Sequence, residues 1–389
     1  MTDTATVPSD PREHEALWRA LGTVQDPEIR RPITELDMVE SARVDDAGVA
    51  HVGILLTIVG CPAANAIEAA VRAAASGVEG VGAVELTVGV MTPAQRQALT
   101  ERLRGDRGTR EMPFGPGTLT RVFAVTSGKG GVGKSTITAN LAAAFAARGL
   151  RVGIVDADVH GFSIPGLLGV GENAPEAVRP TRLDNMILPP VAHGIKLISI
   201  GMFLDDPRAA VAWRGPMLHR TINQFLTDVY FGDLDVLLLD LPPGTGDIAI
   251  SIGQLLPNAE VVVVTTPQPA AAEVAERSGT LAVQTGQRIA GVIENMAGLV
   301  QPDGSVLDLF GSGGGALVAE RLSTIAKRPV PVLASVPLSV ELRTGGDAGV
   351  PVVIADPESS ASRAILSAAD ALLAGGRSLA GVKLGLSPR

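Results

Sequence analysis

Cysteine and aromatic residues are scarce in this sequence of 389 residues. Cys61 is the only cysteine, and phenylalanine, tryptophan and tyrosine together make up 3% of the chain. A single cysteine excludes a disulfide within the chain, and it excludes a metal site built from two or more cysteines of one chain. With so few aromatic rings, the core must consist mostly of alanine, valine, leucine and isoleucine, which is typical of parallel sheets covered by helices.

Long apolar runs and an excess of basic residues are also missing. No stretch of about 18 apolar residues is available to span a bilayer. The N-terminal residues, MTDTATVPSDPREHE, contain no basic segment followed by an apolar run. The net charge of −9 argues against broad electrostatic binding to nucleic acid or to an anionic membrane. We therefore expect a cytoplasmic protein with no nucleic-acid partner and no membrane partner.

The first part of the chain predicts a small α/β domain over residues 10–104. Strands are expected at 49–58 and 83–90, because these runs are rich in β-branched and apolar residues. The alanine-rich segment between them, 62–76, predicts a helix.

A larger domain follows a short connection. Residues 105–120 are rich in glycine, proline and charge, and they are predicted to be a linker. From 121 to 375, short apolar strands alternate with helices, which predicts an α/β fold with a doubly wound, mostly parallel sheet. Residues 376–389 are predicted to be a flexible tail.

A glycine-rich stretch, SGKGGVGKST, follows the first strand of the larger domain. Residues 128–135 match the P-loop pattern G-x-x-x-x-G-K-[ST], in which backbone N–H groups and a helix N-terminus surround phosphate oxygens. Lys134 is expected to reach the β- and γ-phosphates of ATP, and Ser135 is expected to ligate Mg²⁺. The residues of this stretch predicted to bind the nucleotide are Gly128, Lys129, Gly130, Gly131, Val132, Gly133, Lys134, Ser135 and Thr136.

Two other interpretations of this stretch are weaker. Gly128, Gly130 and Gly133 also fit the dinucleotide-binding pattern G-x-G-x-x-G, with Asp156 at the end of the next strand. That pattern has no use for a lysine and a serine at the start of the helix. A glycine-rich turn without a ligand would not need the complete motif between a strand and a helix.

Polar residues end several predicted strands of the larger domain, beside the expected ligand crevice. Asp240 has the Walker B position and is predicted to hold Mg²⁺ together with Ser135. Asp156 or Asp158 is expected to orient the attacking water, and the sequence does not distinguish between the two. Asn295 is expected to pair with the adenine edge of the nucleotide. The plainer interpretations are aspartates that cap helices and an asparagine that forms a turn.

An additional lysine, Lys129, precedes Lys134 in the loop. The stretch KGGVGKS resembles the deviant Walker A motif of MinD, ParA, the arsenite-pump ATPase and the nitrogenase iron protein. In those families the early lysine reaches across a dimer to the phosphates bound by the partner. The resemblance implies a homodimer that closes on ATP, in which both lysines are catalytic.

Further segments are similar to the Mrp/ApbC family of iron–sulfur cluster carriers. These segments are WRGPM (213–217), LDVLLLDLPPGTGD (234–247), VVVVTTPQ (261–268), ENM (294–296) and FGSGGG (310–315). The resemblance implies a slow ATPase that uses ATP and Mg²⁺, binds an iron–sulfur cluster and transfers it to apoprotein clients.

The N-terminal domain carries a second resemblance. DPEI (26–29), LDMV (36–39) and LLTIVGCP (55–62) are similar to the metal–sulfur cluster assembly domain that is often fused to these ATPases. The order of the two domains agrees with that fusion.

The chain departs from the Mrp/ApbC pattern at the expected cluster site. Many members carry C-x-x-C shortly after ENM, so that two chains supply four thiolates, but here Gln301 and Gly304 stand in those positions. Neither residue can replace a thiolate ligand. Cys61 remains as the cluster candidate. It precedes Pro62 and is predicted to be a helix N-cap, which would lower its thiol pKa. The plainer interpretation is a buried, small apolar residue.

Three functions therefore fit the sequence. The first is the cluster carrier. The second is an ATP-driven regulator or chaperone that has lost cluster binding. The third is a positioning ATPase of the MinD/ParA type, which needs a membrane-binding or DNA-binding surface that the C-terminal residues lack.

Overall fold

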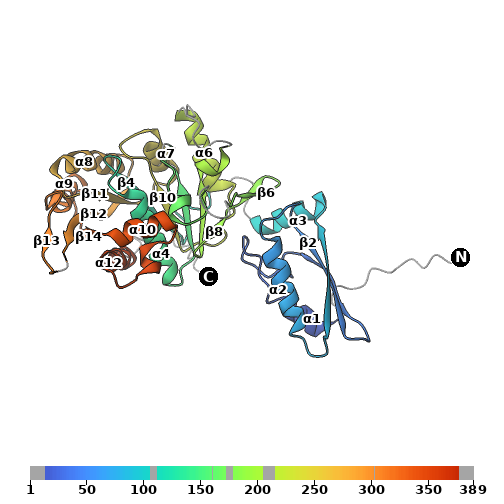
Figure 1. Cartoon of the computed structure of the whole chain (residues 1–389). Helices are drawn as coiled ribbons and strands as arrows, with labels where there is room; N and C mark the ends of the chain where they lie inside the picture. Colours follow the sequence, from blue (N-terminus) through green and yellow to red (C-terminus); the bar gives the residue numbers. More distant parts are fainter. Residues whose placement is uncertain are drawn as a thin grey trace, which may run out of the picture. The chain divides into compact units, whose positions relative to one another are not determined.

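The described chain divides into two compact units. The computed structural model describes residues 14–105, 112–159, 161–171, 178–204, 215–301 and 303–375. The first unit contains the described residues up to Gly105 together with residues 180–189, and the second contains the others (Figure 1). The predicted tail at 376–389, residues 106–111 of the predicted linker and residues 10–13 of the predicted first domain lie outside the described residues.

The described part of the first unit holds a three-stranded sheet. β1 (Val39–Val44) pairs antiparallel with β2 (Val49–Leu56), and β2 pairs parallel with β3 (Ala83–Val90). The helix α2 (Ala64–Ser76) connects β2 to β3, because parallel neighbours need a long crossover. The predicted helix between two strands is therefore present, and it starts two residues later than expected.

Two further helices and a hairpin complete this unit. The helices are α1 (Glu15–Leu21) and α3 (Pro93–Arg104). β6 (Thr181–Leu183) and β7 (Met186–Leu188) form the antiparallel hairpin. These residues lie within the range predicted for the ATPase domain, yet they group with the first unit. The reason is that hairpin side chains bind this unit, as when the Thr181 hydroxyl donates to the buried Glu28.

The second unit is built on a mostly parallel sheet, which contains nine strands among the described residues. The strands are β4 (Arg121–Ser127), β5 (Val152–Asp156), β8 (Val191–Ala192), β9 (Ile195–Ser199), β10 (Val236–Asp240), β11 (Glu260–Thr265), β12 (Arg288–Val300), β13 (Val306–Leu307) and β14 (Val332–Leu338). Their order is β13–β12–β11–β4–β10–β5–β9–β8, and β14 also pairs with β12. β8 and β13 are antiparallel to their neighbours, whereas the other pairs are parallel.

Helices cover both faces of this sheet (Figure 1). The helices of the second unit are α4 (Lys134–Ala147), α5 (Ile164–Leu167), η1 (Ile200–Phe203), α6 (Gly215–Thr227), α7 (Asp247–Leu255), α8 (Pro269–Gln284), α9 (Gly314–Ala326), α10 (Val340–Ala348), α11 (Val352–Ala355) and α12 (Ser360–Ala374). α4, α5, α10, α11 and α12 pack among themselves, and α6 to α9 form the second group. This arrangement confirms the predicted doubly wound fold. In the described part of the chain, none of the helices has both the length and the apolar character needed to cross a bilayer.

The strand register brings polar strand ends together. Asp240 at the end of β10 lies opposite Val125 of β4 on one side and opposite Asp156 of β5 on the other. Because these strands are parallel, their carboxyl ends and the loop after β4 meet at one edge of the sheet. The candidate site lies at this edge.

Candidate functional site

The loop between β4 and α4 has the backbone shape that phosphate binding requires. Gly131 and Gly133 have φ angles of 79° and 81°, in the left-handed region that a residue with a Cβ atom enters only at a cost. Gly133 is the N-cap of α4, so Lys134 and Ser135 stand in the first turn of a helix whose positive end faces the loop.

Two loop glycines also allow close contacts. A Cβ atom on Gly128 would lie 2.3 Å from the backbone nitrogen of Ala275 in α8. A Cβ atom on Gly133 would lie 2.2 Å from Nδ2 of Asn295. By contrast, the nearest atom to a Cβ on Gly130 is Cγ of Pro243, at 4.0 Å. Packing therefore requires glycine at positions 128 and 133 but not at position 130.

A Gly128→Ala substitution is expected to lower the free energy of unfolding by about 2 kcal/mol or more, because backbone of α8 cannot yield to the added methyl group. Gly130→Ala is the matched control and is expected to cost less than about 1 kcal/mol. Denaturant unfolding of the nucleotide-free proteins measures both. Equal losses in the two variants would contradict the assigned role of Gly128.

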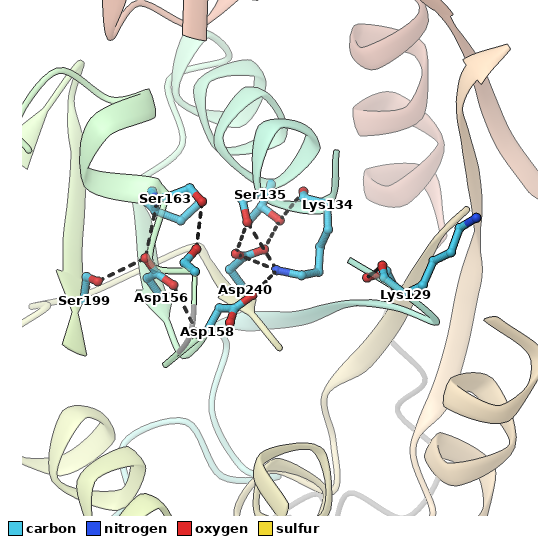
Figure 2. Close-up of polar contacts among 12 residues, drawn as sticks. Lys129, Lys134, Ser135, Asp156, Asp158, Ser163, Ser199 and Asp240 are labelled. Carbon is cyan, nitrogen blue, oxygen red and sulfur yellow. Dashed lines mark hydrogen bonds and ion pairs between the residues drawn. The ribbon is translucent and has the colours of Figure 1, made fainter. Parts of the chain in front are cut away.

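A buried lysine and a buried aspartate form the centre of the site. Lys134 Nζ lies 2.8 Å from Asp240 Oδ2 and 3.5 Å from Asp158 Oδ2 (Figure 2). The Ser135 hydroxyl donates to Asp240 Oδ2 at 2.6 Å, and the Thr138 hydroxyl donates to Asp240 Oδ1 at 2.8 Å. The structure thus brings together Lys134, Ser135 and Asp240 as the sequence predicts. Thr138 was missed, although its place one helical turn after Lys134 is a usable signal.

The two aspartates after β5 have different surroundings. Asp156 is fully buried, and it accepts hydrogen bonds from the Asp158 backbone N–H at 3.2 Å and the Ser199 hydroxyl at 3.0 Å. Burial first, and the neighbouring Asp240 second, raise the pKa of Asp156 well above the usual value for an aspartic acid. Asp158 instead lines the cleft beside the loop. Asp156 is therefore enclosed by protein and bonded to the Asp158 backbone, whereas Asp158 borders the cleft.

The cleft around the loop has a volume of about 520 Å³. Besides the loop residues and Asp158, its lining includes Gly161, Ser163, Leu167 and Pro243. Sequence reasoning missed these four. Three of them follow the DAD segment that begins at the last residue of β5, and Pro243 follows Asp240. Proximity to a strand-end aspartate was therefore the available signal.

Two of the predicted nucleotide residues, Asn295 and Lys129, make their contacts away from the Lys134–Asp240 pair. Asn295 is buried and donates from Nδ2 to the carbonyl oxygen of Val132 at 2.8 Å, so it supports the loop from β12. Lys129 Nζ donates to Oε1 of Gln268 at 3.0 Å. Figure 2 shows that Lys129 points away from Lys134 and its carboxylates.

The environment of Cys61 differs from the predicted one. Ala63, not Cys61, is the N-cap of α2, and the cysteine is buried with 6% of its surface exposed. Burial raises the pKa of the thiol, and the carboxylates of Glu28 and Asp26 raise it further. The expectation of a lowered pKa was therefore wrong, because the thiol is desolvated among acidic groups rather than placed at a helix end.

The position at which the family motif has C-x-x-C is a tight turn in this chain. The Gly304 N–H donates to the carbonyl oxygen of Gln301 at 2.9 Å, and Gly304 has a φ of 84°. The turn connects β12 to β13. Throughout the described ranges, no group of three or more histidine, cysteine, aspartate or glutamate residues could hold a metal ion.

Comparison with known families agrees with this geometry. Residues 118–373 match the ParA family, described as NUBPL iron-transfer P-loop NTPases, and residues 14–86 match a family of iron–sulfur cluster assembly proteins. The chain belongs to the NUBPL iron-transfer P-loop NTPase family. As a P-loop NTPase of this family it is an ATPase, and the dinucleotide interpretation of the loop is excluded.

Relatives of this NUBPL-type NTPase match nearly its whole length. An iron–sulfur cluster carrier protein of Mycobacterium tuberculosis (strain H37Rv) is 55% identical over 374 residues, which cover 96% of each chain. A protein of the same name from Synechocystis sp. is 38% identical over 357 residues, covering 91% of this chain and 95% of the relative. A solved nucleotide-binding protein from Archaeoglobus fulgidus, in complex with ADP, is 37% identical, with a TM-score of 0.49 over 59% of this chain and 86% of that one.

Proposed function

We propose that this protein is an ATP-hydrolysing carrier that binds iron–sulfur clusters and transfers them to apoprotein clients as a nucleotide-gated homodimer. The observation that carries the proposal is the 55% identity to the iron–sulfur cluster carrier protein of Mycobacterium tuberculosis over both domains. The P-loop geometry supplies the ATPase part of this function.

The loop and its lysine bind the phosphates of ATP. Lys134 is paired with Asp240 and Asp158, and it would turn to the β- and γ-phosphates when ATP enters. Ser135 and Asp240 would hold Mg²⁺, because both carry the oxygen ligands that this ion prefers and their side chains already lie side by side, joined by a hydrogen bond. When bound, the ion neutralises charge on the phosphates.

Asp158 is the residue that orients the attacking water in this proposal. It lines the cleft, whereas Asp156 is fully buried. The carboxylate of Asp156 acts on Asp158 by accepting a hydrogen bond from the backbone N–H of Asp158. Asp156 is thus a positioning residue, and Asp158 is the group beside the reacting atoms.

Lys129 supports the homodimer. Its ammonium group lies outside its own Lys134–Asp240 cluster and is held by Gln268. A cation in that position would complete the phosphate site of a second chain, as an arginine finger supplied in trans does. ATP bound between the two chains would then favour the closed dimer over the open one.

Cys61 is the proposed cluster ligand. One thiol cannot hold a cluster, so two chains would each contribute Cys61, with further ligands from small external thiols. Because burial and two carboxylates raise its pKa, the thiol must lose its proton as iron binds.

A second function is favoured by the turn at Gln301 and Gly304. Because this turn has replaced the usual cysteines, the protein would act as an ATP-driven regulator or chaperone that has lost its cluster. The ATPase geometry is the same in both functions.

Anaerobic reconstitution with iron and sulfide distinguishes the two. For the carrier, we expect bound iron and visible charge-transfer absorption in the wild type, and loss of both in Cys61→Ala. Lys134→Ala is the control that should keep the cluster, since it lies in the other unit. A wild-type protein that stays colourless and free of iron would overturn the carrier function and leave the regulator.

A further inference from the structure

Both ends of one chain segment bind the same carboxylate of the ATPase site. The Ile164 N–H and the Ser199 hydroxyl donate to Oδ2 of Asp156, at 3.4 Å and 3.0 Å (Figure 2 draws the Ser199 bond). The other oxygen of Asp156 accepts from the backbone of Asp158. The start and the end of the segment 164–199 are therefore both fixed beside the residue that faces the ligand.

The middle of this segment belongs to the other unit. Residues 180–189, the hairpin of β6 and β7, group with the first unit. Thr181 donates to Oε1 of Glu28 at 2.7 Å, and both side chains are buried. At the tip of the hairpin, Oδ1 of Asn185 accepts from the Arg104 guanidinium of α3 at 2.8 Å.

The residue that receives the hairpin also influences Cys61. Glu28 lies close enough for its carboxylate to raise the thiol pKa. Its backbone is fixed by Asp26, whose Oδ1 accepts from the N–H groups of Glu28 and Ile29 at 2.9 Å and 2.8 Å. The hairpin and the thiol therefore share one neighbour, Glu28, whose backbone is held by Asp26.

We propose that the hairpin 180–189 is a relay that couples ATP binding at the P-loop to the accessibility of Cys61. It deepens the proposed function, on which it rests for ATP as the ligand and Cys61 as the cargo residue. ATP and Mg²⁺ bring new charges to Lys134 and Asp158, and Asp158 is bonded to Asp156. Because Asp156 accepts from the Ser199 hydroxyl, a change there reaches the hairpin through the described residues 190–198, which join the hairpin to Ser199.

The single cysteine makes the proposal directly measurable. Alkylation of Cys61 by iodoacetamide is followed by mass spectrometry, with and without Mg²⁺ and the non-hydrolysable analogue AMP-PNP. Cys61 is buried, so we expect its alkylation to be slow without nucleotide. We expect the nucleotide to accelerate it by about fivefold or more, the lower range of typical coupling between sites.

A variant without the Thr181 hydroxyl tests the relay, because this hydroxyl bonds the hairpin to Glu28. Thr181→Val is expected to abolish the nucleotide-dependent change, whereas Thr181→Ser keeps the hydroxyl and should keep the change. ATP turnover should stay at the wild-type level in both. If Thr181→Val fails to fold, Asn185→Ala removes the exposed contact with Arg104 and is expected to reduce the acceleration.

Two results would overturn the relay. One is a wild-type alkylation rate that is unchanged or lower at saturating AMP-PNP. The other is an acceleration that persists undiminished in Thr181→Val. Neither result depends on cluster binding, because alkylation needs no iron. A failure of the carrier function in the reconstitution experiment is therefore separate from a failure of the relay.

Discussion

Replacing Lys129 with glutamine is expected to lower ATP turnover by about a thousandfold while ATP still binds, as when an arginine finger is removed. The reason is geometric. The Lys129 ammonium is bonded to Gln268 and points away from the Lys134 cluster, so in the proposed dimer it serves the phosphates of the partner chain. The measurements are steady-state phosphate release and the binding of a fluorescent ATP analogue.

A mixing experiment tests whether Lys129 acts on the partner chain. Lys129→Gln and Asp158→Asn are each expected to be inactive alone, since each site would lack one group. In a mixed dimer, one of the two sites would have both Asp158 from its own chain and Lys129 from the other. Random mixing should restore about a quarter of the wild-type rate, since half of the dimers are mixed and one site in each works. No recovery in a mixture that does form dimers would place Lys129 in its own site and contradict the proposal.

Replacing Asp240 with asparagine is expected to reduce ATP turnover by about a hundredfold or more and to weaken the dependence on Mg²⁺. Asp240 is fully buried and accepts from Lys134, Ser135 and Thr138. The amide has lost the negative charge, so it cannot balance the ammonium group of Lys134 or hold the ion with Ser135.

The same substitution is expected to destabilise the nucleotide-free protein by about 3 kcal/mol, because it leaves a buried lysine without its main partner. Asp235→Asn is the matched control. Asp235 directly precedes β10, its side chain is 37% exposed, and its partner Arg151 is on the surface, so the expected loss is about 1 kcal/mol or less. Titrations with Mg²⁺ and denaturant unfolding provide the two readouts. Equal stability of the two variants would show that the buried pair contributes no more than the surface pair.

The ATPase fold and the phosphate loop could be predicted from the sequence because their signals are local. The P-loop uses the backbone N–H groups of consecutive residues, and a helix must start directly after it, so the order GKGGVGKS contains the whole requirement. Apolar strand runs ending in aspartate likewise place Asp240 at the carboxyl edge of a parallel sheet.

The roles of individual side chains in that site were less predictable. Asp156 and Asp158 are two residues apart and looked equivalent in the sequence. Only the packing of β9 against β5 shows that Ser199 reaches Asp156 and leaves Asp158 to line the cleft. The partner of Lys129, Gln268, is likewise 139 positions away in the chain.

By itself, the sequence determined a P-loop ATPase with a small N-terminal domain, and it determined that one thiol per chain is available to a cluster. The tertiary structure decided that this thiol is buried, with its pKa raised by burial and by Glu28, and that it is not the N-cap of the following helix. It also decided that residues 180–189 belong to the first unit, although they lie within the sequence range of the ATPase domain. The physical reason is that burial and charge are set by neighbours distant in the chain. No local spacing records which distant residues a side chain meets.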